Sequence, residues 1–331
     1  MEKIVLGLSG GVDSAVAARL LQQGGYTVFG LYLDNGTETA RKDAEQTAAF
    51  LGIPLKIVDI REALERNVCV PFAAAYLRGE TPNPCVLCNP TVKFQSLLDY
   101  ADAIGAPYVA TGHYARAEQG ALYKGMPAND QSYMLCRLTT EQVARLRLPL
   151  GGYEKEEVRA LAQQFEIPVA EKPDSMEICF IPDKDYIRWI EGRTQVPGGG
   201  NFVFNNKVIG QHDGIHCYTV GQRYKELYHD RRLYVSEIRP ETNTVVLCLW
   251  EDLFSNRVKV RDMNWLIPFP KTPIRAAIRV RHTKWENPMA TVTVSGTGFM
   301  AVTEEPLRAP APGQAAALYD GDRLLGGGYI V

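Results

Sequence analysis

Apolar positions follow two different periods along the first half of the chain. Short apolar runs with the length of a strand alternate with segments in which apolar residues recur every three or four positions, as on one face of a helix. The pattern predicts strands over residues 3–8, 27–33, 55–60 and 108–111, and helices over residues 12–23, 38–51 and 93–104. Strands and helices that alternate in this order indicate an α/β domain with a parallel sheet covered on both faces.

The pattern changes at Pro197-Gly198-Gly199-Gly200, which predicts a linker after a short helix at 183–191. A hairpin over 201–209 that turns at Asn205-Asn206 and a strand pair over 233–249 predict a small, mainly β central domain. From residue 252 onward the apolar runs are short, alternating and bounded by Pro or Gly, which favours a small antiparallel β-barrel or sandwich, and we expect the barrel. We therefore expect three domains, at 1–196, 197–251 and 252–331.

Composition and charge narrow the class of protein. The chain has 331 residues, 46% of them hydrophobic, with a net charge of −2 at pH 7. Indiscriminate binding to nucleic acid depends on phosphate neutralisation, so any RNA site must be a local basic patch. Seven cysteines, an odd number, do not resemble a secreted disulfide framework. Without a signal peptide or an apolar run of membrane-spanning length, we expect a cytoplasmic protein with no membrane partner.

A glycine-rich loop, Ser9-Gly10-Gly11-Val12-Asp13-Ser14, joins the first predicted strand to the first predicted helix. Glycines let backbone N–H groups approach an anion closely, and the helix N-terminus and the serine hydroxyls favour negative charge there. The loop lacks the lysine of the G-x-x-x-x-G-K-[ST] motif. It therefore predicts a phosphate site of another kind, with a plain Gly-Gly turn as the alternative.

Three cysteines lie in surroundings that distinguish them from the other four. Cys85 and Cys88 form a C-x-x-C pair after Thr81-Pro82-Asn83-Pro84, and Cys179 follows Asp174-Ser175-Met176-Glu177-Ile178. Zinc, iron–sulfur and redox sites all use C-x-x-C pairs, and the lack of a second pair disfavours a four-cysteine zinc site. Buried thiols are the alternative for these three. That interpretation is preferred for Cys69, Cys136, Cys217 and Cys248.

Further motifs follow in one order and extend the pattern over nearly the whole chain. They are Ala110-Thr111-Gly112-His113-Tyr114, Asp130-Gln131-Ser132-Tyr133, Gly210-Gln211-His212-Asp213-Gly214, Tyr218-Thr219-Val220-Gly221-Gln222-Arg223 and Pro312-Gly313-Gln314. Together with the glycine-rich loop and the cysteine segments, they resemble the bacterial tRNA-specific 2-thiouridylases (the MnmA/TrmU family). The resemblance implies a Rossmann-like PP-loop ATPase domain that splits ATP into AMP and pyrophosphate.

The resemblance also implies a reaction, the 2-thiolation of the wobble uridine in tRNAs for Lys, Glu and Gln. ATP with Mg²⁺ would activate the uridine C2 oxygen as an adenylate. Sulfur would come from a persulfide on Cys179, loaded by a donor such as a cysteine desulfurase or a sulfur-relay protein, and Cys88 would be the attacking partner. The residues implied at the nucleotide are Gly7, Leu8, Ser9, Gly10, Gly11, Val12, Asp13, Ser14, Leu33 and Gly112. Asp13 is expected either to place phosphates or magnesium or to cap the helix.

The same resemblance implies where tRNA binds. The residues concerned are Asn83, Pro84, Cys85, His113, Asn129, Asp130, Gln131, Arg281, His282 and Gln314. Because the C2 oxygen is reached only when the uridine leaves the base stack, we expect Asn83, Pro84 and Cys85 to line a base pocket. Arg275, Arg279 and Arg281 fall on one face of an alternating strand, extended by His282 and Lys284. That face is expected to bind phosphates, with a solvated strand face as the alternative.

The chain departs from the family at Cys85, where Asp is common. Cys85, Cys88 and Cys179 could hold three irons of a [4Fe-4S] cluster whose fourth iron delivers sulfide, which is the alternative to the persulfide. Asn129, where lysine is common, and Tyr224-Lys225-Glu226, where glycines are common, leave nearby tRNA contacts open. A PP-loop ligase acting on another carbonyl and a non-catalytic RNA-binding or iron–sulfur protein are further hypotheses.

Overall fold

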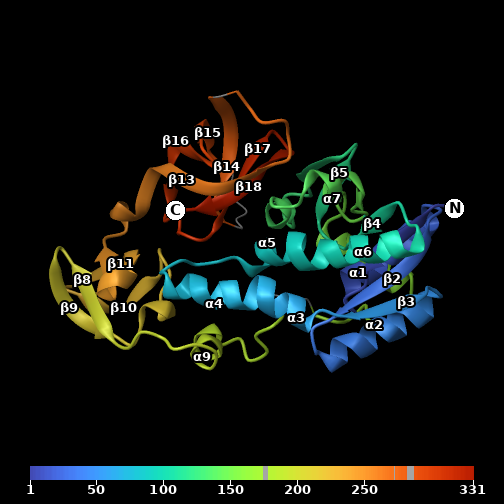
Figure 1. Cartoon of the computed structure of the whole chain (residues 1–331), viewed down its shortest axis with the longest axis horizontal. Helices are drawn as coiled ribbons and strands as arrows, with labels where there is room; N and C mark the ends of the chain where they lie inside the picture. Colours follow the sequence, from blue (N-terminus) through green and yellow to red (C-terminus); the bar gives the residue numbers. More distant parts are fainter. Residues whose placement is uncertain (174–177, 272, 282–286) are drawn as a thin grey trace. The chain divides into compact units, whose positions relative to one another are not determined.

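The computed structural model describes residues 1–173, 178–271, 273–281 and 287–331, which form two compact units (Figure 1). The first unit consists of Met1–Val68, Cys85–Met176 and Gly321–Leu324. The second consists of Cys69–Pro84, Glu177–Asp320 and Leu325–Val331. A boundary between the units therefore falls directly before the C-x-x-C pair. None of the described helices is long and apolar enough to cross a membrane.

A five-stranded sheet in the order β3-β2-β1-β4-β7 is the centre of the first unit. Its strands are β1 (Lys3–Gly7), β2 (Thr27–Asp34), β3 (Leu55–Asp59), β4 (Tyr108–Ala110) and β7 (Leu146–Arg147). Every pairing in it is parallel. Parallel sheets need cover on both faces, and the central strand β1 is accordingly buried at Ile4, Val5 and Leu6. The predicted Rossmann-like parallel sheet is confirmed.

Helices cover this sheet (Figure 1). The helices in this part of the chain include α1 (Val12–Gln23), α2 (Glu38–Leu51), α3 (Arg61–Leu64), α5 (Pro84–Cys88), α6 (Phe94–Ile104), α7 (Thr140–Ala144) and α8 (Lys155–Gln164). Apolar residues of α1, α2 and α8 share one core cluster with alternate residues of β1 and β2. Helix α6 packs against β1, β2 and β4. A hairpin of β5 (Ala115–Glu118) and β6 (Ala121–Lys124) follows β4.

The second unit contains a five-stranded sheet in the order β10-β11-β12-β8-β9. Its strands are β8 (Gly200–Phe204), β9 (Lys207–His212), β10 (Arg223–Tyr228), β11 (Arg231–Arg239) and β12 (Thr244–Cys248). Asn205 and Asn206 both have positive φ, 50° and 60°, as a two-residue hairpin turn requires. Two helices, α4 (Val70–Leu77) and α9 (Tyr186–Glu191), supply a separate apolar cluster around Phe72 and Ile190.

A closed antiparallel barrel of six strands forms the rest of the second unit. Its strands are β13 (Phe254–Trp265), β14 (Ile274–Arg279), β15 (Met289–Ser295), β16 (Gly298–Arg308), β17 (Ala315–Asp320) and β18 (Arg323–Ile330). Pairing between β13 and β18 closes the barrel. Its core is built from small and branched residues such as Ala276, Ile278 and Val292, each fully buried. The predicted C-terminal barrel is confirmed.

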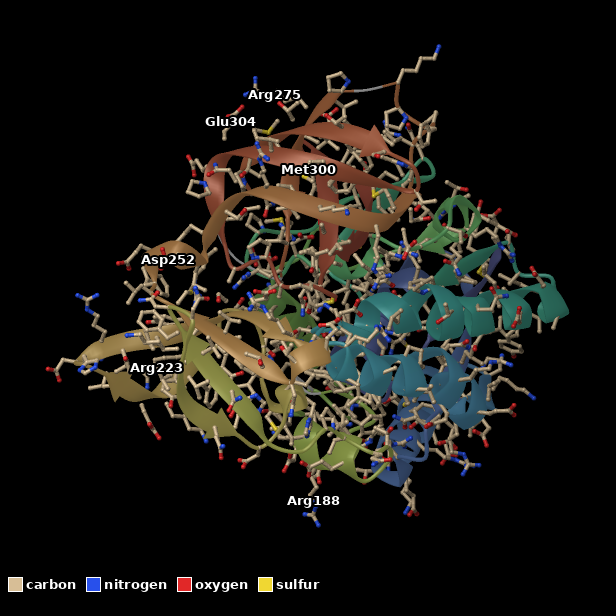
Figure 2. All side chains as sticks on the ribbon, turned by 60° about the vertical axis from the view of Figure 1, so that its left-hand side comes forward. Arg188, Arg223, Asp252, Arg275, Met300 and Glu304 are labelled. Carbon is tan, nitrogen blue, oxygen red and sulfur yellow. The ribbon has the colours of Figure 1, made fainter. Side chains whose placement is uncertain are left out.

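The structure corrects the expected arginine face on β14. The alternation is present, since Ala276, Ile278 and Val280 lie in the core. Arg275 is exposed and pairs with Glu304, both labelled in Figure 2. Arg279, however, is only 7% exposed, with its guanidinium 5.1 Å from the ring centre of Tyr319. The solvated strand face given as the alternative therefore does not include Arg279, whose guanidinium lies beside the Tyr319 ring of β17.

Candidate functional site

The glycine-rich loop lies where the carboxyl ends of three neighbouring strands meet. In the sheet order, β1 lies between β2 and β4. Leu33 is near the end of β2, the loop follows β1, and Gly112 and His113 follow β4. This is the edge at which open α/β sheets bind ligands. The structure thus brings together the residues that the sequence predicted around the nucleotide.

The loop itself has the backbone of an anion site. Gly10 adopts φ +73°, and a Cβ there would lie 2.5 Å from the Ala40 carbonyl oxygen of α2, so only glycine fits. Gly11 is the N-cap residue of α1 and offers no capping side chain, so the first N–H groups of the helix are left for a ligand. The hydroxyl oxygens of Ser9 and Ser14 lie 3.2 Å apart beside them. These features fit the phosphates of ATP.

Asp13 pairs with a lysine. Its Oδ1 accepts from Lys155 Nζ at 2.6 Å and from the Tyr114 hydroxyl at 2.7 Å. Asp13 is in the first turn of α1 and does not cap the helix, because Gly11 occupies the cap position. Of its two expected roles, helix capping is thus not the one observed. The lysine comes from the first turn of α8, which packs against α1.

A second lysine reaches the same loop. Lys172 Nζ donates to the Gly10 carbonyl oxygen at 3.0 Å and to Asp43 Oδ2 at 2.5 Å. Neither Lys172 nor Lys155 was predicted from sequence, because each is more than a hundred residues away from the aspartate with which it pairs. Lys155 is a single lysine at the start of α8, and no other local pattern distinguishes the two lysines. Two ammonium groups, each paired with a carboxylate, thus lie beside the phosphate loop.

Gly112 and His113 complete the rim of the loop. A Cβ on Gly112 would lie 2.9 Å from the Asp13 carbonyl carbon and 3.0 Å from Ser14 N, so this glycine lets β4 approach the first turn of α1. His113 stacks on Phe94, and its Nδ1 is 2.7 Å from Thr111 Oγ1. Burial, with a smaller effect of the Lys93 charge, lowers the pKa of His113 well below 6.5. The ring is therefore neutral at physiological pH.

The C-x-x-C pair begins a helix. Pro84 is the first residue of α5, a position where its missing N–H costs nothing. Cys85 and Cys88, three residues apart, point to one side of this helix, Cys85 exposed and Cys88 partly buried. The buried Asn89 that follows donates its amide to the Met134 carbonyl oxygen at 2.8 Å and anchors the segment. Both thiols are thus held on an anchored helix.

Cys179 lies on the second unit, in a turn closed by a hydrogen bond from Ile181 N to the Ile178 carbonyl oxygen. Its neighbours Ile178 and Phe180 pack into the cluster around Phe72, and the Phe180 and Trp189 ring centres are 5.1 Å apart. The Cys179 side chain itself is exposed. Asp174, Ser175, Met176 and Glu177 lie outside the described residues. The turn therefore presents the thiol while its flanks are anchored.

The Thr81-Pro82-Asn83-Pro84 segment is fixed to the barrel motif Pro312-Gly313-Gln314. Thr81 N donates to the Pro312 carbonyl oxygen at 2.7 Å. Gly313 has φ +86°, and a Cβ there would lie 2.8 Å from Glu80 Cβ and 2.9 Å from Thr81 N. Glu80 also accepts from Arg78 at 2.7 Å and from Arg261 at 3.1 Å. Two motifs more than two hundred residues apart in sequence thus form one support for the segment before Cys85.

The remaining residues expected at tRNA have mixed surroundings. Asp130 is buried and accepts from Gly125 N, Ser132 N and the Ser132 hydroxyl, which indicates a role in shaping its own loop. Gln131 accepts from Tyr114 N, and Asn129 donates to Glu154. Arg281 Nη2 donates to the carbonyl oxygens of Arg308 and Ala309 at 2.5 and 2.6 Å. His282 and Lys284 lie outside the described residues.

The described residues contain no group of three or more His, Cys, Asp or Glu side chains placed to hold a metal ion. Of the three cysteines expected at such a site, Cys85 and Cys88 belong to the first unit and Cys179 to the second.

Family models and similar proteins of known sequence point to the same family. Family models match residues 2–183 (tRNA methyl transferase HUP domain), 190–249 (tRNA methyl transferase PRC-barrel domain) and 255–330 (aminomethyltransferase beta-barrel domain). The tRNA-specific 2-thiouridylase MnmA of Carboxydothermus hydrogenoformans is 41% identical, covering 99% of this chain and 97% of its own. That of Geotalea uraniireducens is 40% identical, covering 99% and 95%. The chain belongs to the family of tRNA-specific 2-thiouridylases.

Proposed function

We propose that this protein is an ATP-dependent tRNA uridine 2-sulfurtransferase that acts in the cytoplasm on the wobble uridine of tRNAs for Lys, Glu and Gln. The observation that carries the proposal is the loop at residues 9–14 with the two lysines, Lys155 and Lys172, on a chain that aligns with these enzymes over its full length. A carbonyl oxygen is a poor leaving group, so a reaction that replaces it with sulfur needs prior activation.

In the first step the uridine C2 oxygen attacks the α-phosphorus of ATP, and pyrophosphate leaves. The N–H groups at the start of α1 and the ammonium groups of Lys155 and Lys172 stabilise the negative charge that develops on the leaving group. Lys155 is held by Asp13, and Lys172 by Asp43, so both are oriented before the nucleotide arrives. Mg²⁺, when bound with ATP, would add a further positive charge at the phosphates.

In the second step sulfur replaces the activated oxygen. A donor protein first leaves a persulfide on Cys179. The Cys88 thiolate then attacks the Cys179 Sγ, forming a Cys88–Cys179 disulfide and releasing hydrosulfide. Hydrosulfide attacks C2 of the uridine, and AMP leaves with the former C2 oxygen. A dithiol reductant restores both thiols for the next cycle. The exposed position of Cys179 supports loading by a separate protein.

The test is nucleoside analysis of tRNA transcripts treated with the full-length protein, ATP and a persulfide donor. We expect 2-thiouridine at the wobble position and release of pyrophosphate that depends on tRNA. Cys179→Ser should abolish thiolation, whereas a PP-loop ligase acting on another carbonyl would remain active. Iron and acid-labile sulfide in anaerobically purified protein, lost in Cys85→Asp, would replace the persulfide route by the [4Fe-4S] alternative. Absence of thiouridine with every donor would refute the proposal.

A further inference from the structure

An outer face of the second unit combines aromatic rings with arginines. Its members, which we call the aromatic–arginine strip, are Arg223, Arg232, Tyr234, Trp250, Phe254 and Arg308. The site described above uses none of their side chains. Because the strip belongs entirely to the second unit, its geometry follows from the register of the central sheet and the first strand of the barrel.

Strand register places the polar end of the strip on one face. Arg223 of β10, at the edge of the sheet (Figure 2), lies directly opposite Tyr234 of β11, and Leu227 lies opposite Arg232. Directly opposite residues share a face of the sheet. Leu233 and Val235, which alternate with them, are buried in the sheet's core. Arg223 and Arg232 therefore point away from that core, and both are exposed.

A run of ring contacts continues the strip. The ring centres of Tyr234 and Trp250 are 5.3 Å apart, and those of Trp250 and Phe254 are 5.8 Å apart. The Arg308 guanidinium lies 4.4 Å from the centre of the Trp250 ring and is held by a hydrogen bond to the Gly221 carbonyl oxygen. Trp250 and Phe254 nevertheless remain 44% and 39% exposed. Large aromatic side chains left this exposed beside arginines mark a binding surface.

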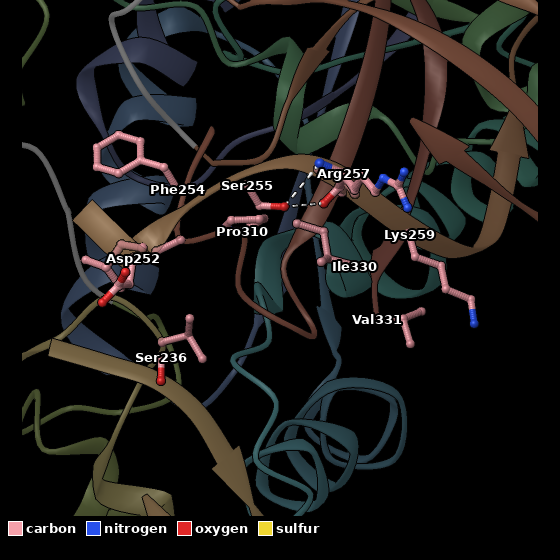
Figure 3. Close-up of a pocket in the computed structure, with 13 residues that line it drawn as sticks. Ser236, Asp252, Phe254, Ser255, Arg257, Lys259, Pro310, Ile330 and Val331 are labelled. Carbon is pink, nitrogen blue, oxygen red and sulfur yellow. Dashed lines mark hydrogen bonds between the residues drawn. The ribbon is translucent and has the colours of Figure 1, made fainter. Parts of the chain in front are cut away.

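A cavity of about 270 Å³ borders the strip (Figure 3). Asp252 and Phe254 lie at one end of it and Lys259 at the other, with Arg257 on the same strand as Lys259. Drug-sized ligands occupy roughly 300–1,000 Å³, so this cavity suits one heterocyclic base with part of its sugar. The Asp252 carboxylate can accept from a base amino or imino group, and the two cations at the other end suit a phosphate.

The charge of this surface favours a polyanion. The strip and the lining of its cavity contribute the cations Arg223, Arg232, Arg257, Lys259 and Arg308 and the carboxylate of Asp252, in a chain whose net charge is −2. We propose that the strip and its cavity bind an unpaired nucleotide of the tRNA substrate, with the base on Trp250 and Phe254 and the neighbouring phosphates on the arginines. Base stacking on aromatic rings beside cations is the usual way in which proteins hold single-stranded RNA. The inference rests on the proposed function, because it takes tRNA as the substrate.

The test measures tRNA affinity and thiolation kinetics separately in the full-length protein. Trp250→Leu and Phe254→Leu keep apolar volume but remove the stacking ring, and each should raise the dissociation constant for tRNA at least about fivefold. Arg223→Ala should weaken binding and reduce the slope of log affinity against log salt by about one. At saturating tRNA the kcat for thiolation should be unchanged, so that only KM rises.

Matched controls exist on the same unit. Phe269→Leu removes an aromatic side chain that is 66% exposed elsewhere, and Lys207→Ala removes a cation from a strand at the opposite edge of the central sheet. Equal tRNA affinities of the strip variants and these controls would overturn the inference. The inference would also be overturned if the strip variants bound tRNA normally and lost thiolation only when sulfur came from the donor protein, because the strip would then be a protein interface. Failure of the wild type to thiolate tRNA would instead refute the proposed function, since binding is measured without turnover.

Discussion

Gly313→Ala should disturb the segment that leads into the C-x-x-C pair, although the two lie far apart in sequence. Gly313 adopts φ +86°, where an L-residue costs roughly 1–2 kcal/mol. The added Cβ would also lie 2.8 Å from Glu80 Cβ and 2.9 Å from Thr81 N, so it presses on a backbone as well as on a side chain. Overpacking of this kind costs about 1–3 kcal/mol. We therefore expect a total loss of about 2–5 kcal/mol in the free energy of unfolding.

Gly296→Ala separates the two contributions. Gly296 also has positive φ, +57°, in the turn between β15 and β16, but nothing lies within 4 Å of its Cβ position. Only the backbone cost should appear there. Urea unfolding followed by tryptophan fluorescence gives the stability of both variants, and thiolation under folding conditions gives kcat. Gly313→Ala should lower kcat, because Thr81 to Pro84 lead into Cys85, whereas Gly296→Ala should not. Equal stability losses and equal kcat values in the two variants would refute this reasoning.

Three further changes test the site and its surroundings. Lys172→Met should lower kcat about a hundredfold or more, as loss of one electrostatic stabiliser does in other enzymes. The control Lys42→Met removes only an exposed ion pair with Glu38, so its kcat should match that of the wild type. Equal kcat values for the two variants would exclude Lys172 from phosphate stabilisation. Gly112→Ala should weaken ATP binding, measured by calorimetry, because its Cβ meets the first turn of α1, whereas Gly152→Ala has open space and should bind normally. His212 is buried, and this burial lowers its pKa from 6.5. Below pH 6.5 the unfolded chain binds a proton that the folded chain does not, so the contribution of His212 to the free energy of unfolding is complete above that pH and falls by up to about 1.4 kcal/mol per pH unit below it. In urea unfolding at several pH values, the free energy of unfolding of His212→Phe should therefore fall less steeply with decreasing pH than that of the wild type. The same slope in both proteins would contradict this assignment.

Local sequence patterns were sufficient for the scaffold of the site. The two glycines between β1 and α1 predicted the phosphate loop, and the helices at 12–23 and 38–51 have the predicted bounds, because hydrophobic period and glycine act within a few residues. The order of the parallel strands then placed Leu33, the loop and Gly112 at one edge. The loop and the helix bounds depend on residues that are close together in the sequence, so local patterns can predict them.

Long-range partners could not be predicted in the same way. Lys155 reaches Asp13 across 142 residues because α8 packs on α1, and no period in the sequence indicates that pairing. Arg279 alternates as a surface residue should, yet Tyr319 of the neighbouring strand β17 covers it. Alternation identifies the two faces of a strand, but in a closed barrel the neighbouring strands decide which outward side chain is covered. The support of Thr81 by Gly313 likewise appears only when the barrel is assembled.

The most direct test of the account follows one oxygen atom. In the proposed reaction ATP activates the uridine C2 oxygen, which then leaves with AMP when sulfur replaces it. A tRNA labelled with oxygen-18 at C2 of the wobble uridine is incubated with the full-length protein, ATP and a persulfide donor, and the AMP is analysed by mass spectrometry. We expect one labelled AMP for each 2-thiouridine formed. Unlabelled AMP alongside 2-thiouridine would contradict it, because ATP would then be activating something other than the uridine.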